Sequence, residues 1–204
     1  MSRLAEALQA AAEDLDELGA RWALVGGLAV STWCDPRLTR DIDVAVSVTG
    51  DKDAERLVRD LQQRGYETLE LIEQEATARL ATARLVRRDL PAILIDVLFA
   101  SSGIEAEIVS GAVTTEVFAG VHVPVASRAH LIALKLLARD DRQRPQDYDD
   151  LRALLLDARD ADLAETRRAV ALITERGFDR HRDLPRALEE LLRSGNVHRS
   201  TDRF

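Results

Sequence analysis

Residues 92–100, AILIDVLFA, form a nearly continuous apolar run that follows Pro91. A short run of this kind is typical of a strand that is covered on both faces in the middle of a sheet. Its one charged residue, Asp96, is costly in such a strand unless it is paired, hydrogen-bonded or bound to a metal ion. The run therefore predicts a central strand, and it leaves two partners open for Asp96: an arginine of a neighbouring strand, Arg84 or Arg87, or a cation.

The remaining periodicity predicts strands and helices first and helices alone afterwards. An α+β fold is expected, with a mixed β-sheet core and flanking helices in residues 1–125 and a small C-terminal helical bundle in residues 126–204. The last residues, 194–204, are expected to be frayed. The expected strands are 22–25, 41–48, 66–72, 80–88, 92–100, 113–118 and 121–126, and the expected helices are 4–18, 28–34, 51–64, 103–112, 127–141, 145–158, 163–177 and 183–195.

Composition excludes several classes of protein. The chain has 204 residues, of which 46% are hydrophobic, so it can bury one core with a smaller appendage. It has no apolar stretch near the roughly 18 residues of a membrane helix and no signal-like amino terminus, so we expect a cytoplasmic protein without a membrane partner. The net charge of −8 disfavours an extended contact with a nucleic-acid backbone and leaves a local contact open.

Two aspartates open the strand DIDVAVSV. Asp41 and Asp43 point to the same face, with Cα atoms about 6 to 7 Å apart, because side chains alternate along a strand. In a partly desolvated site their repulsion calls for a proton or a cation, and a hard divalent ion such as magnesium takes oxygen ligands. If this strand lies beside the Asp96 strand, three carboxylates converge as in a two-metal site for phosphoryl transfer. The alternative is that Asp41 and Asp43 lie on the solvent-exposed face of an edge strand.

Gly26 and Gly27 lie between a strand and a short helix, upstream of Asp41. Without side chains, their backbone N–H groups can approach an anion closely. An ordinary turn is the alternative, since glycines mark turns far more often than phosphate sites.

These features together resemble a known family. The stretch LVGGLAVSTWCDPRLTRDIDVAV is similar to the opening motif of the nucleotidyltransferase superfamily, and its Pro-Arg-x-Thr-x-Asp-x-Asp form resembles the AbiEii-type nucleotidyltransferases, which include toxins of two-gene toxin–antitoxin systems. VPVASRAHLIALKLLARDDRQRPQDYDDL is similar to the second signature of that family, a lysine-bearing helix followed by Arg-Pro-x-Asp-x-x-Asp-Leu.

The resemblance implies an enzyme that transfers a nucleoside monophosphate from an NTP to a hydroxyl. It implies that Asp41 and Asp43 hold magnesium (Mg²⁺, with manganese, Mn²⁺, as a substitute), that Asp96 is a third ligand or the base, and that Gly26 and Gly27 hold the triphosphate. RNA, such as the tRNA 3′ end, is the acceptor that the resemblance implies, and an antitoxin protein is an implied partner. The alternatives are a small-molecule nucleotidyltransferase, such as one that modifies an antibiotic, and a non-catalytic nucleotide-binding or partner-binding module.

Four further residues complete the expected site. Arg37 and Thr39 can donate to phosphate, although Arg37 can also pair with Asp35 and Thr39 can simply shape its loop. Lys135, one of only two lysines, can bind a triphosphate oxygen, or its stem can lie on the core with its head in water. Asp147 matches the second signature and can orient Lys135 or contact the nucleotide; as an alternative, it favours the positive end of a helix.

Overall fold

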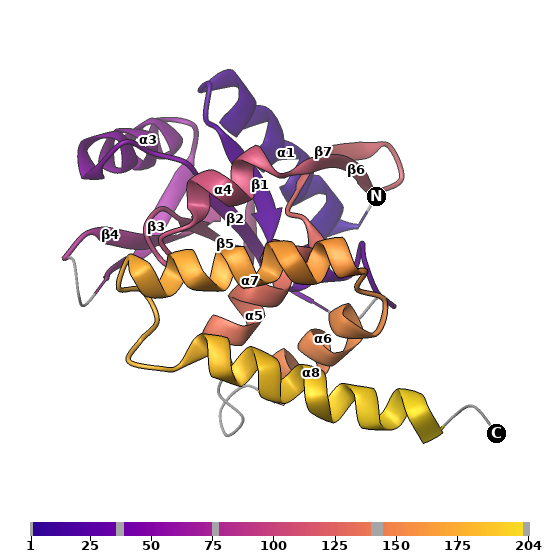
Figure 1. Ribbon diagram of the computed structural model, residues 1–204. Helices are drawn as coiled ribbons and strands as arrows, with labels where there is room; N and C mark the ends of the chain where they lie inside the picture. The colour runs from indigo at the N-terminus through magenta and orange to yellow at the C-terminus, as the bar shows by residue number, and fades with distance from the viewer. Residues whose placement is uncertain (1, 36–38, 75–77, 140–144, 202–204) are drawn as a thin grey trace.

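The structure of the chain is a computed structural model that describes residues 2–35, 39–74, 78–139 and 145–201. The described residues form a seven-stranded sheet and eight helices, which confirms the expected α+β fold (Figure 1). The strands are β1 (Trp22–Val25), β2 (Ile42–Val46), β3 (Tyr66–Glu73), β4 (Leu80–Arg87), β5 (Leu90–Leu98), β6 (Val113–Phe118) and β7 (Val121–Val125). The helices are α1 (Arg3–Glu17), α2 (Gly26–Val30), α3 (Asp51–Gln63), α4 (Glu105–Ser110), α5 (Arg128–Ala138), α6 (Pro145–Leu156), α7 (Asp160–Glu175) and α8 (Leu184–Thr201).

The sheet is mixed, with the strand order β3-β4-β5-β2-β1-β7-β6. The pairs β2–β5 and β1–β7 are parallel, and the other neighbours are antiparallel. The expected central position of the apolar run is confirmed, because β5 lies between β4 and β2. Side chains of Ile93, Ile95 and Val97 are buried on β5, and all four residues of β1 are buried. An all-apolar β1 is thus explained by its place near the middle of the sheet.

Asp14 on α1 connects that helix to the β3–β4 hairpin and to the end of α3. Its carboxylate accepts hydrogen bonds from the Tyr66 hydroxyl at 2.8 Å, from Arg87 Nη1 at 2.8 Å and from Arg64 Nη1 at 3.0 Å. Arg87 therefore pairs with Asp14 and not with Asp96. Since Arg84 and Arg87 are three residues apart on one strand, their side chains leave opposite faces of the sheet.

The helices after the sheet pack around α5, which contacts α2, α6, α7 and α8. In Figure 1, α7 and α8 run below the sheet as the orange and yellow layers of the molecule. The expected frayed end is wrong as far as Thr201, because α8 continues to that residue. The division of the chain into a core at 1–125 and a helical region at 126–204 stays a prediction.

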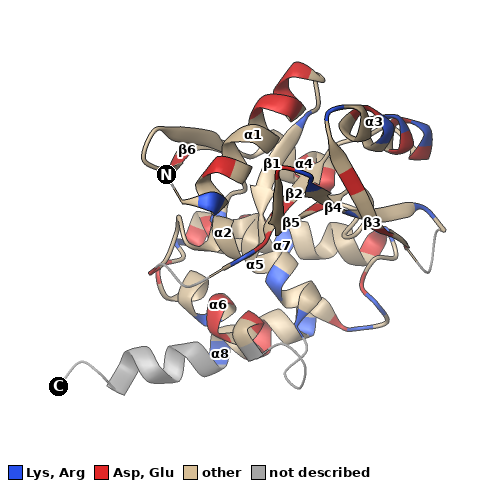
Figure 2. Ribbon diagram, turned by 180° about the vertical axis from the view of Figure 1, so that it is seen from behind, with Lys and Arg blue, Asp and Glu red and all other residues tan. Residues whose placement is uncertain are grey.

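Charged residues of both signs are interspersed along α3, as Figure 2 shows. Four acidic residues, Asp51, Asp53, Glu55 and Asp60, share this helix with Lys52, Arg56 and Arg59. None of the helices in the described ranges is both long and apolar enough to cross a membrane.

Candidate active site

The register of β2 against β5 brings two of the predicted carboxylates together. Asp43 is the Cα partner of Asp96, so the side chains lie on the same face of adjacent parallel strands. Both side chains are partly buried. The strand adjacency that the sequence required for a convergent site is therefore present.

Asp41 lies just outside this pair. It is exposed and precedes the first residue of β2, Ile42, so it is not part of the strand in which the sequence placed it. Its negative charge still contributes to raising the pKa of Arg84, after the larger effects of Asp96 and Glu70. Asp41 therefore lies within electrostatic range of the residues around Asp96.

Gly26 approaches Asp43 more closely than any residue with a side chain could. Gly26 has φ +66°, and a Cβ atom at this position would lie 1.9 Å from Asp43 Oδ2 and 2.8 Å from Asp43 Cβ. The backbone turn that joins β1 to α2 therefore packs directly against the carboxylate. Sequence reasoning expected Gly26 to make room for phosphate, whereas the close approach seen here is to Asp43.

Asp96 takes the first of the two partners that the sequence left open. Arg84 Nε donates to Asp96 Oδ1 at 2.9 Å, and Arg84 Nη2 donates to Asp96 Oδ2 at 2.9 Å. This bidentate bond is the main reason that the pKa of Arg84 is raised. Among the residues that the structure describes, no group of three His, Cys, Asp or Glu side chains is already arranged to hold a metal ion.

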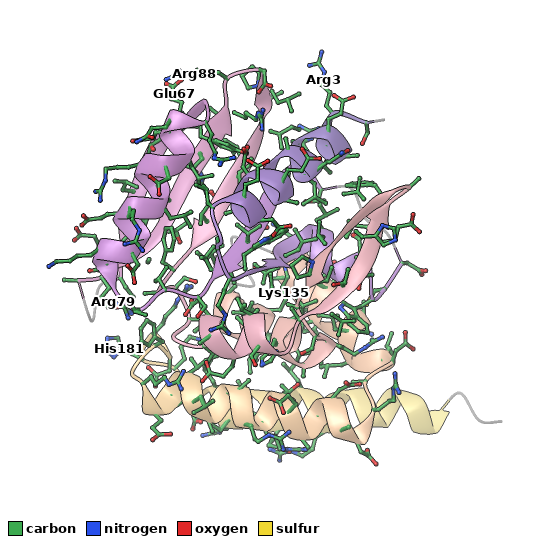
Figure 3. The ribbon with its side chains drawn as sticks, turned by 90° about the horizontal axis from the view of Figure 1, so that it is seen from above. Arg3, Glu67, Arg79, Arg88, Lys135 and His181 are labelled. Atoms are coloured by element: carbon green, nitrogen blue, oxygen red, sulfur yellow. The ribbon has the colours of Figure 1, made fainter. Side chains whose placement is uncertain are left out.

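Lys135 belongs to a second, buried cluster between α5 and α6. Its Nζ lies 2.7 Å from Asp147 Oδ1 and 2.8 Å from Asp150 Oδ2, and the three side chains are only 10%, 6% and 3% exposed. Lys135 lies in the interior of the molecule, as Figure 3 shows, and its head does not reach water as one alternative supposed. The expected contact of Asp147 with Lys135 is present.

Both helices that carry the Lys135 cluster, α5 and α6, contact α2, the helix that Gly26 and Gly27 begin. Asp147 Oδ2 is buried without a hydrogen-bond partner among the described residues. The cluster places one ammonium and two carboxylates close together in the interior. Asp149, in contrast, is exposed.

The loop before β2 carries the last two predicted residues. Thr39 is partly buried, and Arg37 lies outside the described residues. A separate cavity of about 200 Å³ lies at the other end of β2, where Val48, Asp53 and Arg56 contribute to its lining. None of the predicted site residues lines this cavity.

Sequence reasoning missed the full role of Arg84. It offered Arg84 and Arg87 equally as partners of Asp96. The hairpin between β4 and β5 contained a signal, because antiparallel pairing would place one of these arginines near Asp96. The signal was ambiguous because the register shifts between Val86 and Arg87.

The mixed seven-stranded sheet with its flanking helices is a nucleotidyltransferase-like fold. A family model described as "Nucleotidyl transferase AbiEii toxin, Type IV TA system" matches residues 7–202, so the chain belongs to this family of enzymes. No curated protein matches the sequence.

Solved structures agree on the fold. A crystal structure of ANT(2″)-Ia in complex with adenylyl-2″-tobramycin has a TM-score of 0.51 and 18% identity, and covers 85% of this chain and 96% of that one. An antigenic nucleotidyltransferase-like protein from Paracoccidioides brasiliensis has a TM-score of 0.50 and 19% identity, and covers 87% of this chain and 89% of that one. At these identities the likeness concerns the fold.

Proposed function

We propose that the enzyme uses Mg²⁺, or Mn²⁺ in its place, to transfer a nucleoside monophosphate from an NTP to an acceptor hydroxyl. The observation that carries the proposal is the register of Asp43 beside Asp96. Neighbouring strands are only about 4.8 Å apart, so the two carboxylates favour a cation between them. The donor set is all oxygen and suits Mg²⁺ and Mn²⁺, and Asp41 can add a ligand from the segment that enters β2.

In the proposed reaction, Asp41 and Asp43 are metal ligands, and Asp96 is the third ligand or accepts the proton of the acceptor hydroxyl. The hydroxyl oxygen bonds to the α-phosphorus of the NTP. The bond from that phosphorus to the oxygen bridging the β-phosphate breaks, and pyrophosphate leaves. Two bound magnesium ions would neutralise phosphate charge and stabilise the attacking and leaving oxygens. The protein contributes mainly positioning and electrostatics.

The triphosphate is assigned to the backbone of Gly26 and Gly27, with Arg37 and Thr39 as side-chain donors. Lys135 and Asp147 complete the proposed nucleotide site. Because the Lys135 ammonium is bonded to two buried carboxylates, a contact with phosphate requires a change in this cluster. Loss of one carboxylate bond would free one of the three Nζ–H donors for a phosphate oxygen.

The proposed setting is the cytoplasm, where NTPs and RNA are available, and the family description supports a toxin with an antitoxin protein as partner. RNA, such as the tRNA 3′ end, is the first candidate acceptor. A small-molecule hydroxyl is the second, because ANT(2″)-Ia shares the fold and was crystallised with adenylyl-2″-tobramycin. The net charge of −8 also favours an acceptor that needs little contact with a phosphate backbone.

The decisive experiment offers each NTP, labelled on the α-phosphate, together with total cellular RNA or with an aminoglycoside. We expect label in one acceptor, only when Mg²⁺ or Mn²⁺ is present. Asp43→Asn should abolish transfer while the chain stays folded, whereas Asp157→Asn, an exposed carboxylate after α6, should transfer at the wild-type rate. Transfer by Asp43→Asn at the wild-type rate, or transfer without a divalent ion, would contradict the metal assignment.

A further inference from the structure

Arg84 is held between two carboxylates of neighbouring strands. On β5, both oxygens of Asp96 accept from Arg84 Nε and Nη2 at 2.9 Å. On β3, Glu70 Oε2 accepts from the remaining amino group, Nη1, at 3.3 Å. The Arg84 side chain is 34% exposed, compared with 16% for Asp96 and 52% for Glu70. The guanidinium thus joins a sheltered carboxylate to a solvated one.

The strand registers place these groups in one row across the sheet. Glu70 is the partner of Arg84, Arg84 is the partner of Asp96, and Asp96 is the partner of Asp43. Along the row, the charges are negative, positive, negative and negative. One guanidinium therefore neutralises Asp96 beside a second carboxylate, Asp43, against which the backbone of Gly26 packs.

The row sets up a competition for the oxygens of Asp96. A divalent ion between Asp43 and Asp96 needs at least one oxygen of Asp96 in its coordination sphere, and Arg84 bonds to both of them. A metal ion and a guanidinium bound to the same carboxylate also repel each other. Binding of the ion therefore favours loss of an Arg84–Asp96 bond, and Glu70 is a second carboxylate that can retain Arg84.

We propose that Arg84 is a positioning residue that holds Asp96 in the metal-free protein and moves toward Glu70 when a divalent ion binds. Arg84 thereby sets the affinity of the site for metal. This inference rests on the proposed metal site, and it concerns a residue outside the proposed ligands. The arginine prevents repulsion between Asp43 and Asp96 before metal arrives, and it makes metal binding weaker than the carboxylates alone would.

The first test is the affinity of the purified full-length chain for Mn²⁺, measured by calorimetric titration without nucleotide. Removing the competing cation with Arg84→Gln should tighten Mn²⁺ binding by about tenfold, the equivalent of one charged hydrogen bond. Arg84→Lys restores a positive charge and should bring the affinity back toward the wild-type value. Glu70→Gln removes the alternative partner of Arg84 and should weaken Mn²⁺ binding.

The matched control is Arg87→Gln on the same strand. Arg87 also bonds to two carboxylates, those of Asp14 and Asp89, but it points to the opposite face. Arg87→Gln should lower the thermal stability and leave the Mn²⁺ affinity unchanged. For Arg84→Gln, the unfolding temperature in EDTA should fall below that of the wild type, and added Mn²⁺ should raise it by more than it does in the wild type.

Three outcomes separate this inference from the proposed function. If Arg84→Gln binds Mn²⁺ as the wild type does, while Asp43→Asn does not bind, the metal site stands and the role of Arg84 is refuted. Weaker binding by Arg84→Gln also refutes it, because the arginine would then support the metal. If neither the wild type nor Arg84→Gln binds Mn²⁺, the metal site itself fails and the competition fails with it.

Discussion

Replacing Gly26 with alanine tests whether the backbone at the end of β1 fixes Asp43. The new Cβ would overlap Asp43 Oδ2 at 1.9 Å, and a rotation of the carboxylate would not suffice because Asp43 Cβ would lie at 2.8 Å. A left-handed alanine costs about 1–2 kcal/mol by itself. The overlap forces the strand or the turn to shift, which adds about 1–3 kcal/mol. Gly26→Ala should therefore lower the free energy of unfolding by about 2–5 kcal/mol.

The chain offers a close control in Gly19, after α1. Gly19 has the same φ of +66°, but a Cβ there meets no atom within 4 Å. Gly19→Ala should cost only the backbone term of about 1–2 kcal/mol. Urea denaturation gives both free energies, and Mn²⁺ titration should show weaker binding only for Gly26→Ala. Equal losses of stability in the two variants, with equal Mn²⁺ affinity, would refute the packing of Gly26 on Asp43.

Two further predictions concern buried ionisable groups. Lys135→Met removes the ammonium that is bonded to two buried carboxylates and should cost about 3–5 kcal/mol in urea denaturation. Lys52→Met, at the other and exposed lysine, should change stability by less than about 0.5 kcal/mol. Similar small effects of both would show that the Lys135 cluster is not a buried ion pair. Burial lowers the pKa of His130 from its ordinary value of 6.5, against the opposing charges of Glu165 and Glu107, so the unfolded chain takes up the proton first and stability should fall as the pH drops below 6.5. His130→Gln should make the urea midpoint depend less on pH. An unchanged dependence on pH would contradict the role of His130 in the loss of stability below pH 6.5.

Local pattern was sufficient for most elements of the fold. The helix expected at 51–64 is α3 (Asp51–Gln63), and its apolar residues Leu57, Val58 and Leu61 are buried as their spacing indicated. The central strand around Asp96 followed from its nearly continuous apolar run. The carboxyl-terminal end was harder, because the last residues of a chain are commonly frayed, whereas α8 continues to Thr201.

The register between β4 and β5 shows why the partner of Asp96 was not determined. The turn pairs Arg87 with Leu90, and a regular ladder from that pair would place Arg84 opposite Ile93. The irregularity between Val86 and Arg87 moves the pairing, so that Arg84 meets Asp96. Such a shift decides which side chains share a face, and no local pattern in the sequence specifies it.

The sequence by itself determined most of the strands and helices and the identity of the charged residues that a buried sheet has to accommodate. Its two motifs also indicated the enzyme family, because each motif is a short stretch of residues that can be read without knowledge of the fold. Only the tertiary structure decided that Asp43 faces Asp96, that Gly26 packs on Asp43, and that Lys135 is enclosed by two aspartates. These contacts join segments far apart in the chain, and their geometry depends on strand order and register, which are fixed when the whole sheet and its helices pack together.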